Sequence, residues 1–284
     1  MMNVFKYLGR AASEFFLSDM TLRFSQPKAL NDPFELRPEF YCEPFDLRGR
    51  TNFKTRFVLK GHSSVVKNYI VKQDDFSAGC LAVDTRYQVE QLNSLLGVLC
   101  LTRDSRSTPK NLLMWAHYSE SHSGIVVKFK SDCEFVSNAH EVHYVKSRPL
   151  ISAKIFYDHE YISIGDMYFK SDAWGYEKEI RASARLEDCI NTGHKDVFGY
   201  EIYVSAIDVS AIECVYVGVN ASDALKIRAS EFHKKTGVDV IYLTVSSEGF
   251  ILIPYRFDTQ KTYDSMMASV FAFHERVPEV APPV

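Results

Sequence analysis

The chain has 284 residues, of which 46% are hydrophobic and 24% are charged, and its formal net charge is −3. This composition is typical of a soluble globular protein, and the length suffices for one large domain or two small ones with a sizeable core. The slightly acidic balance argues against a protein dominated by binding to a phosphate backbone, although it leaves room for a local basic groove.

The cysteines show neither a metal-binding nor a disulfide pattern. There are six of them: Cys42, Cys80, Cys100, Cys133, Cys189 and Cys214. No two form a CxxC pair and the gaps are irregular, which argues against a zinc cluster and a disulfide framework. We therefore expect reduced thiols in a cytoplasmic protein. The N-terminus lacks the apolar core of a signal peptide, and no window reaches the roughly 18 apolar residues of a membrane span, so no membrane partner is expected.

The first predicted elements are a strand, a helix and a second strand. Apolar and aromatic residues at 4–8 indicate a strand, and the spacing at 11–19 indicates a helix. Alternation at 21–27 indicates another strand. The sequence Asn31-Asp32-Pro33 then predicts a turn, because Asn and Asp bond to nearby backbone groups and proline fixes the exit.

The middle of the chain predicts an insertion followed by alternating strands and helices. Residues 44–94 are expected to be a mostly helical insertion, with helical patterns at 65–73 and 88–97. The elements after it are expected as a strand at 97–103, a helix at 111–121, a strand at 124–130, a helix near 158–170 and a strand at 178–185.

The C-terminal part predicts a strand at 210–220, a helix and a hairpin. The helix covers 222–237, where Ser222 is suited to its N-cap and Gly237 to its end. Strands at 238–246 and 250–257 are expected to pair around the sequence SSEG. Residues 261–284 are predicted to be a C-terminal helix and a loose tail. The pattern favours an α+β fold with a single domain over residues 1–260.

The stretch WGYEKEIR, from Trp174 to Arg181, concentrates charge in a short segment. As a strand it directs Glu177, Glu179 and Arg181 to one face. Two interpretations stay open. Either the face is exposed to solvent and its charges form ordinary cross-strand salt bridges, or it lines a site where carboxylates act on a substrate.

Four patches, taken in order, resemble the bacterial domain-of-unknown-function family 2971. They are FKY, FSQPKALNDPFE, LLMWAHYSESHSGIVVKF and WGYEKEIR. The resemblance covers roughly residues 4–255. It departs from the family pattern at Leu8, where members often have an arginine, and Arg10 lies nearby. The β-α-β opening also resembles ADP-ribosyltransferase folds. This resemblance implies a mixed or antiparallel split β-sheet core, and it implies that the protein binds the cofactor NAD and consumes it as a substrate.

This resemblance implies roles for particular side chains. Cleavage of the nicotinamide–ribose bond develops positive charge, which a carboxylate near the ribose stabilises. Glu179 is the first choice for this catalytic carboxylate and Glu177 is its partner. The expected NAD-binding residues are Lys6, Tyr7, Ser25, Asn31, Asp32, Phe34, Trp115, His117, Tyr118, Tyr176 and Arg181.

Several of these residues also have a purely structural interpretation. Asn31 and Asp32 suit a turn. Trp115 and Tyr118 suit a packed core, and a hydrogen-bonded structural histidine is commoner than a catalytic one at a position such as His117. Alternation along the first strand allows only one of its two candidates, Lys6 and Tyr7, to face a pocket.

The sequence contains no Walker or Rossmann loop, no HExxH and no GxSxG motif. Basic clusters at 225–228 and 233–235 lie on a predicted helix and suit its solvated face.

We therefore expect an NAD-dependent mono-ADP-ribosyltransferase that acts as a toxin or an anti-phage defence effector. Its acceptor is a protein or a nucleic acid, and a toxin of this kind often needs an antitoxin partner. Two alternatives stay open: a non-catalytic module that binds a ligand or partner, and an NAD glycohydrolase with water as the acceptor.

Overall fold

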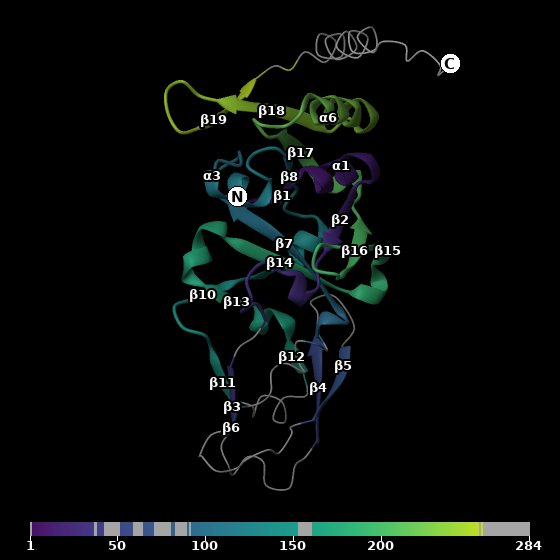
Figure 1. Cartoon of the computed structure of the whole chain (residues 1–284), viewed down its shortest axis with the longest axis vertical. Coiled ribbons are helices and arrows are strands. Elements are labelled where there is room, and N and C mark those ends of the chain that lie inside the picture. Colours follow the sequence, from purple (N-terminus) through teal and green to yellow (C-terminus); the bar gives the residue numbers. More distant parts are fainter. Residues whose placement is uncertain are drawn as a thin grey trace, which may run out of the picture. The chain divides into compact units, whose positions relative to one another are not determined.

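A computed structural model describes residues 2–36, 39–42, 52–58, 65–70, 81–82, 90, 92–152, 161–255 and 257. The fold is α+β, built around a large mixed sheet of eight strands (Figure 1). In spatial order the strands are β19 (Leu252–Tyr255), β18 (Asp239–Val245), β17 (Ile212–Val217), β8 (Ile125–Phe129), β1 (Asn3–Leu8), β7 (Leu96–Asp104), β14 (Glu179–Arg185) and β9 (His140–Glu141).

The chain forms two compact units. The first contains residues 1–6, 21–107 and 129–211, and the second contains residues 7–20, 108–128 and 212–284.

In the first unit, strand β7 is the central strand. Its sequence LGVLCLTRD is largely apolar, and Val98, Leu99 and Leu101 are buried, as expected for a strand covered on both faces. It pairs antiparallel with β1 on one side and with β14 on the other. The β14 register sets Glu179 opposite Thr102 and Arg181 opposite Cys100, so two charged side chains are carried into the core of this unit.

Smaller sheets complete the first unit. An antiparallel sheet has the order β15 (Ile190–Lys195), β16 (Glu201–Ala206), β2 (Thr21–Phe24). Strands β10 (His143–Val145) and β13 (Phe169–Ser171) pair in parallel. Two further sheets have the orders β11 (Leu150–Ser152), β3 (Glu39–Cys42), β6 (Leu81–Ala82) and β12 (Tyr161–Ser163), β4 (Asn52–Val58), β5 (Val65–Ile70). A four-residue helix, α4 (Glu134–Ser137), follows β8.

In the second unit, helices pack beside β17, β18 and β19. Helix α1 (Arg10–Asp19) lies against α6 (Asp223–Thr236), and the rings of Phe16 and Phe232 are 6.1 Å apart. Helix α3 (Leu112–Tyr118) begins at Asn111, whose side chain accepts bonds from two backbone N–H groups. Strand β17 pairs in parallel with β18, and β18 pairs antiparallel with β19, which confirms the predicted C-terminal hairpin.

Most of the strands and helices predicted outside the expected insertion are present, but strands β9, β10, β15 and β16 were not predicted and two stretches were wrong. Within 44–94, the described residues form the strands β4, β5 and β6, and of them only residues 90, 92 and 93 are helical, so the expectation of a mostly helical insertion fails there. The helix expected near 158–170 is replaced by β12, the 3-10 helix η2 (Ile164–Met167) and β13. In both cases strand pairing overrides the local helical pattern. The tail 261–284 lies outside the described residues.

Within the described part of the chain, no helix is long and apolar enough to cross a membrane.

Candidate functional site

The first unit contains a buried cluster of five charged side chains. Its members are Glu35, Lys170, Glu177, Glu179 and Arg181, which we call the charge cluster. Their side chains are between 0% and 5% exposed. Buried charges are uncommon because removing an ion from water is costly unless it is paired. The cluster therefore stands out as the most unusual feature of this unit.

The cluster is held together by short contacts between opposite charges. Arg181 donates from Nε to Glu179 Oε1 at 2.8 Å and from Nη2 to Glu179 Oε2 at 3.0 Å, a bidentate arrangement. Lys170 Nζ donates to Glu177 Oε2 at 2.6 Å and to Glu179 Oε2 at 3.2 Å. Both cations thus converge on Glu179.

Glu35 joins the cluster by charge contact. Its Oε2 lies 2.7 Å from Arg181 Nη1, and its Oε1 lies 3.3 Å from Lys170 Nζ. These two contacts are ion pairs and not hydrogen bonds. Glu35 nonetheless lies between the two cations and contributes a third carboxylate.

Several different elements bring these side chains together. Glu179 and Arg181 are two residues apart on β14 and so share a face of the strand. Glu177 ends the 3-10 helix η3 (Asp172–Glu177), and Lys178 follows in the left-handed conformation with φ 48°. The expectation that Glu177 lies on the strand itself was wrong, because this left-handed residue separates the helix from β14.

Lys170 and Glu35 come from the other side of the site. Lys170 lies in the middle of β13, which pairs with β10. Glu35 lies in the turn after the 3-10 helix η1 (Pro27–Ala29), where the Glu35 N–H bonds to Asp32 O at 3.1 Å. The Phe34 N–H bonds to the Asp32 side chain at 2.9 Å. Asp32 therefore has the turn-forming contacts that its sequence context suggested, and the turn positions Glu35.

The charges shift the pKa values of the cluster in opposite directions. Burial alone raises the pKa of Glu179, but Arg181 and Lys170 outweigh it, so the pKa falls from 4.5 to about 2. Burial lowers the pKa of Lys170, yet the carboxylates of Glu179, Glu35 and Glu177 raise it well above its usual range. Both groups are therefore ionised at neutral pH.

Polar and aromatic groups surround the charged atoms. The Glu179 N–H donates to the Tyr144 hydroxyl at 2.8 Å. Lys170 Nζ lies 4.9 Å from the centre of the Trp174 ring, and the Arg181 guanidinium lies 5.0 Å from the Tyr168 ring. Cations above aromatic faces gain attraction where water is excluded.

Lys6 borders this site from β1. Its ammonium donates to Cys100 O at 2.9 Å. Burial lowers the pKa of Lys6, and the nearby Cys100 and Glu179 partly offset this effect. Of the two candidates on the first strand, Lys6 is thus the one whose charge acts on Glu179.

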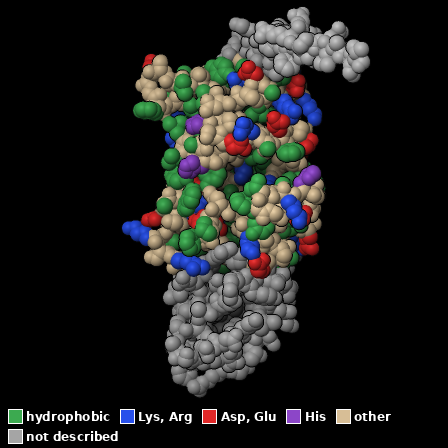
Figure 2. Space-filling view, viewed as in Figure 1, with side chains coloured by type: hydrophobic (Ala, Val, Ile, Leu, Met, Phe, Trp, Pro, Cys, Tyr) green, Lys and Arg blue, Asp and Glu red, His purple; other side chains and the backbone are tan. Residues whose placement is uncertain are grey.

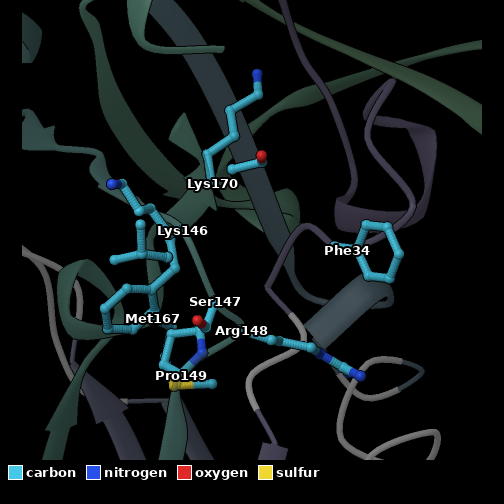
Figure 3. A pocket seen from close by; sticks show the side chains of 10 residues that line it. Phe34, Lys146, Ser147, Arg148, Pro149, Met167 and Lys170 are labelled. Atoms are coloured by element: carbon cyan, nitrogen blue, oxygen red, sulfur yellow. The ribbon is translucent and has the colours of Figure 1, made fainter. Parts of the chain in front are cut away.

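A pocket of about 210 Å³ adjoins the cluster, because Lys170 also lines it. Its wall includes Phe34, Lys146, Arg148 and Met167 (Figure 3). Figure 3 shows the Lys170 side chain extending away from Ser147, Arg148 and Pro149, so its stem lies at the pocket while its ammonium reaches the carboxylates. Arg148 lies 5.9 Å from the centre of the exposed Phe34 ring.

The structure brings part of the predicted site together in the first unit. Glu177, Glu179 and Arg181 are in contact through the cluster, Phe34 lines the adjoining pocket, and Tyr176 lies 6.2 Å from the Trp174 ring. Asn31 is exposed in the turn before Phe34. Ser25 forms an isolated bridge with Val98 of β7.

The remaining predicted residues belong to the second unit, where they pack against one another. The Tyr7 ring meets Trp115 edge-on at 5.7 Å, and Trp115 Nε1 donates to Pro109 O at 2.7 Å. His117 is exposed and lies beside Tyr118. Trp115 is fully buried, as its core interpretation expects. A role for these four residues in binding NAD stays a prediction.

Sequence reasoning missed Lys170 and did not single out Glu35. Glu35 ends the sequence NDPFE, so the motif itself was a signal for it. Lys170 gave no such signal, because its segment was expected to be helical and its partners are brought to it by the fold. The pocket cations Lys146 and Arg148 were also missed.

On the face drawn in Figure 2, the acidic and basic side chains of the described residues are interspersed. The described residues also contain no group of three or more His, Cys, Asp or Glu side chains placed to hold a metal ion.

Comparison with known proteins identifies one region. No curated protein and no solved structure matches the chain, so nothing in these comparisons supports an ADP-ribosyltransferase-like fold. Residues 114–182 match the model of a family described as protein of unknown function (DUF2971). This region includes Lys170, Glu177, Glu179 and Arg181, and excludes Glu35. The chain therefore contains a DUF2971 family domain at residues 114–182, which supplies four of the five members of the charge cluster.

Proposed function

We propose that the chain is an NAD-dependent mono-ADP-ribosyltransferase whose site is the charge cluster and its adjoining pocket. The observation that carries this proposal is the burial of three carboxylates with two cations beside a pocket. Buried ionic groups contribute little net stability relative to apolar ones, and perturbed carboxylates beside a pocket are typical of functional sites. An ADP-ribosyltransferase-like arrangement of the sheet is part of the same proposal.

The chemistry of the reaction suits fixed carboxylates. When the nicotinamide–ribose bond breaks, positive charge develops on the ribose, and an ionised carboxylate nearby stabilises it. The pKa of about 2 keeps Glu179 ionised at any pH where this reaction is useful. Such a low pKa suits a carboxylate that holds Arg181 and Lys170 in place, and it makes Glu179 a poor general base near neutral pH.

The geometry favours different roles for the two glutamates. Glu179 lies within a strand that is paired on both sides, and both its oxygens accept bonds from Arg181 or Lys170. Glu177 lies at the end of η3, outside the sheet, next to the partly exposed Tyr176. We therefore assign substrate contact to Glu177, and we assign to Glu179 the positioning of the two cations.

The adjoining pocket offers complementary groups for part of a dinucleotide. Lys146 and Arg148 suit phosphate oxygens, and the Phe34 ring suits stacking on a flat base. Ligand pockets usually enclose about 300–1,000 Å³. A volume of about 210 Å³ is smaller, so the pocket takes one part of NAD and leaves the rest at the surface.

The biological setting follows the family resemblance. We propose a toxin or anti-phage effector that modifies a protein or nucleic-acid acceptor and is neutralised by an antitoxin partner. Expression in bacteria tests this setting: the wild type slows growth, and the variant Glu177→Gln does not. Equal toxicity of both would argue against it.

A second function, a non-catalytic binding module, is favoured by one observation. Every charge of the cluster has an opposite charge within 3.3 Å, so the cluster is internally compensated without a ligand. Such a module keeps the fold and uses the pocket to hold a ligand or partner. It predicts that NAD, if bound at all, is not cleaved.

Incubation of purified protein with labelled NAD and a cell extract separates these functions. The variants are Glu177→Gln and Glu179→Gln, with Glu187→Gln as the control because Glu187 is an exposed glutamate outside the cluster. The products are digested separately with protease and nuclease, and circular dichroism confirms that each variant is folded.

Transfer by the wild type and Glu187→Gln but not by folded Glu177→Gln supports the transferase, and the digestion identifies the acceptor class. Release of nicotinamide and ADP-ribose without labelled macromolecule identifies a glycohydrolase. If the wild type neither transfers label nor releases nicotinamide, the transferase is wrong and the binding module is favoured.

A further inference from the structure

The second unit contains a larger pocket that the charge cluster does not use. It encloses about 720 Å³, within the usual range of about 300–1,000 Å³ for ligand pockets. Its walls come from the start of α3, the loop after β17 and the β18–β19 hairpin. Apolar side chains such as Leu112, Val219 and Leu252 line it together with His122, Asn220 and Ser246.

His122 is presented to this pocket by an unusual loop. Glu120, Ser121 and His122 all have positive φ, at 48°, 54° and 66°, although none is a glycine. Such backbone is disfavoured and persists only where neighbouring structure enforces it, often at functional sites. Here His122 O accepts from Asn220 N–H at 3.0 Å, and a Cβ on Gly218 would lie 2.2 Å from the same oxygen.

The imidazole of His122 is fixed in position but not fully bonded. Its ring stacks on Trp115 with 4° between the planes and 6.0 Å between centroids. Among the residues that the structure describes, none forms a hydrogen bond with the buried His122 Nδ1. Burial lowers the pKa of His122, so the ring is neutral at neutral pH. A neutral imidazole offers one donor and one acceptor.

The pocket's chemistry restricts its ligand. None of the residues that line it carries a formal charge when His122 is neutral, which disfavours phosphates, carboxylates and cations as the recognised group. Asn220 is held in place because its Nδ2 donates to Ser121 O at 2.8 Å. Amide side chains pair well with the edges of adenine, and exposed aromatic rings such as Phe250, 97% exposed at the hairpin, stack on bases.

We propose that this pocket binds an uncharged, flat heterocycle of the nucleobase type, with adenine as the best match. Its apolar walls enclose the ring, and His122 and Asn220 meet the polar edge. The base comes either from a free nucleoside or from a single-stranded nucleic acid. This site is independent of the proposed NAD chemistry, since none of its residues belongs to the charge cluster.

Isothermal titration of the full chain with adenosine tests the proposal. The main variant is Val245→Trp, because Val245 lines the pocket and is 65% exposed, so a larger side chain fills the pocket without disturbing the core. We expect saturable binding by the wild type, loss of binding in Val245→Trp, and at least about tenfold weaker binding in Asn220→Ala, by analogy with base-edge contacts. Glu187→Gln should bind as the wild type does, because Glu187 is exposed and lines neither pocket.

Further ligands distinguish the sources. If an oligoadenylate binds more tightly than adenosine and this additional affinity is lost in Val245→Trp, the natural ligand is a single-stranded nucleic acid. Adenosine binding without that additional affinity identifies a free nucleoside. Absence of adenosine binding, equal binding by Val245→Trp, or binding of AMP without adenosine would each overturn the proposal.

Discussion

Replacing Arg181 with methionine tests whether the charge cluster is held by opposite charges. Arg181 is fully buried, and it contacts Glu179 twice and Glu35 once. Methionine keeps much of the side-chain length but removes the charge. The variant leaves the three carboxylates of the cluster with Lys170 as its one remaining cation, and it also removes the guanidinium beside the Tyr168 ring.

The low pKa of Glu179 and the usual cost of breaking a buried ion pair indicate a similar loss of stability. The pKa of Glu179 lies at about 2 and not at 4.5, which corresponds to roughly 3 kcal/mol of stability at neutral pH. Arg181 is the largest of the favourable causes of that difference. Breaking a buried ion pair by removing one partner typically costs about 3–5 kcal/mol. We therefore expect Arg181→Met to lower the free energy of unfolding by about 3 kcal/mol.

Urea unfolding at pH 7, followed by circular dichroism, measures this change. The matched control is Arg185→Met on the same strand, since Arg185 pairs with Asp188 and Glu187 at the surface and should have little effect. The double variant Arg181→Met/Glu179→Gln should have a free energy of unfolding at least about 1 kcal/mol higher than the single variant, because it also removes the Glu179 carboxylate that has lost its arginine partner. A loss below about 1 kcal/mol for the single variant, or no recovery in the double, would refute the reasoning.

Three further predictions concern pH, a close backbone contact and a helix cap. The stabilisation from ionised Glu179 is complete above about pH 4.5 and is lost as the pH falls through about 2. In acid, the free energy of unfolding of the wild type should therefore fall by roughly 3 kcal/mol more than that of Glu179→Gln. Parallel pH profiles of the two proteins would contradict this. Gly124→Ala should cost about 1–3 kcal/mol, because its Cβ would lie 1.9 Å from Leu8 O. Gly175→Ala meets nothing within 4 Å and should leave the melting temperature nearly unchanged. Ser222→Ala should cost about 1 kcal/mol in urea unfolding and Ser222→Asp should not, and equal losses would exclude a capping role.

The sequence predicted best those features whose causes are local. Helix α6 begins after Ser222 and ends at Gly237, which adopts φ 75°, because capping depends only on neighbouring backbone groups. The β18–β19 hairpin followed from alternation and a short polar turn. The central strands β7 and β8 were also predicted, since each is an apolar run rich in strand-forming residues.

The tertiary structure decided what depends on distant partners. The alternation of WGYEKEIR put three charges on one face, but it did not determine whether that face is exposed to solvent or buried. Its burial depends on β7, β13 and the turn that carries Glu35. The strands within 44–94 likewise owe their form to pairing with each other or with strands far along the chain, as β4 pairs with β12. Strand pairing and ion pairing act between residues far apart in sequence, so local pattern determines which segments are available and the fold determines which of them meet.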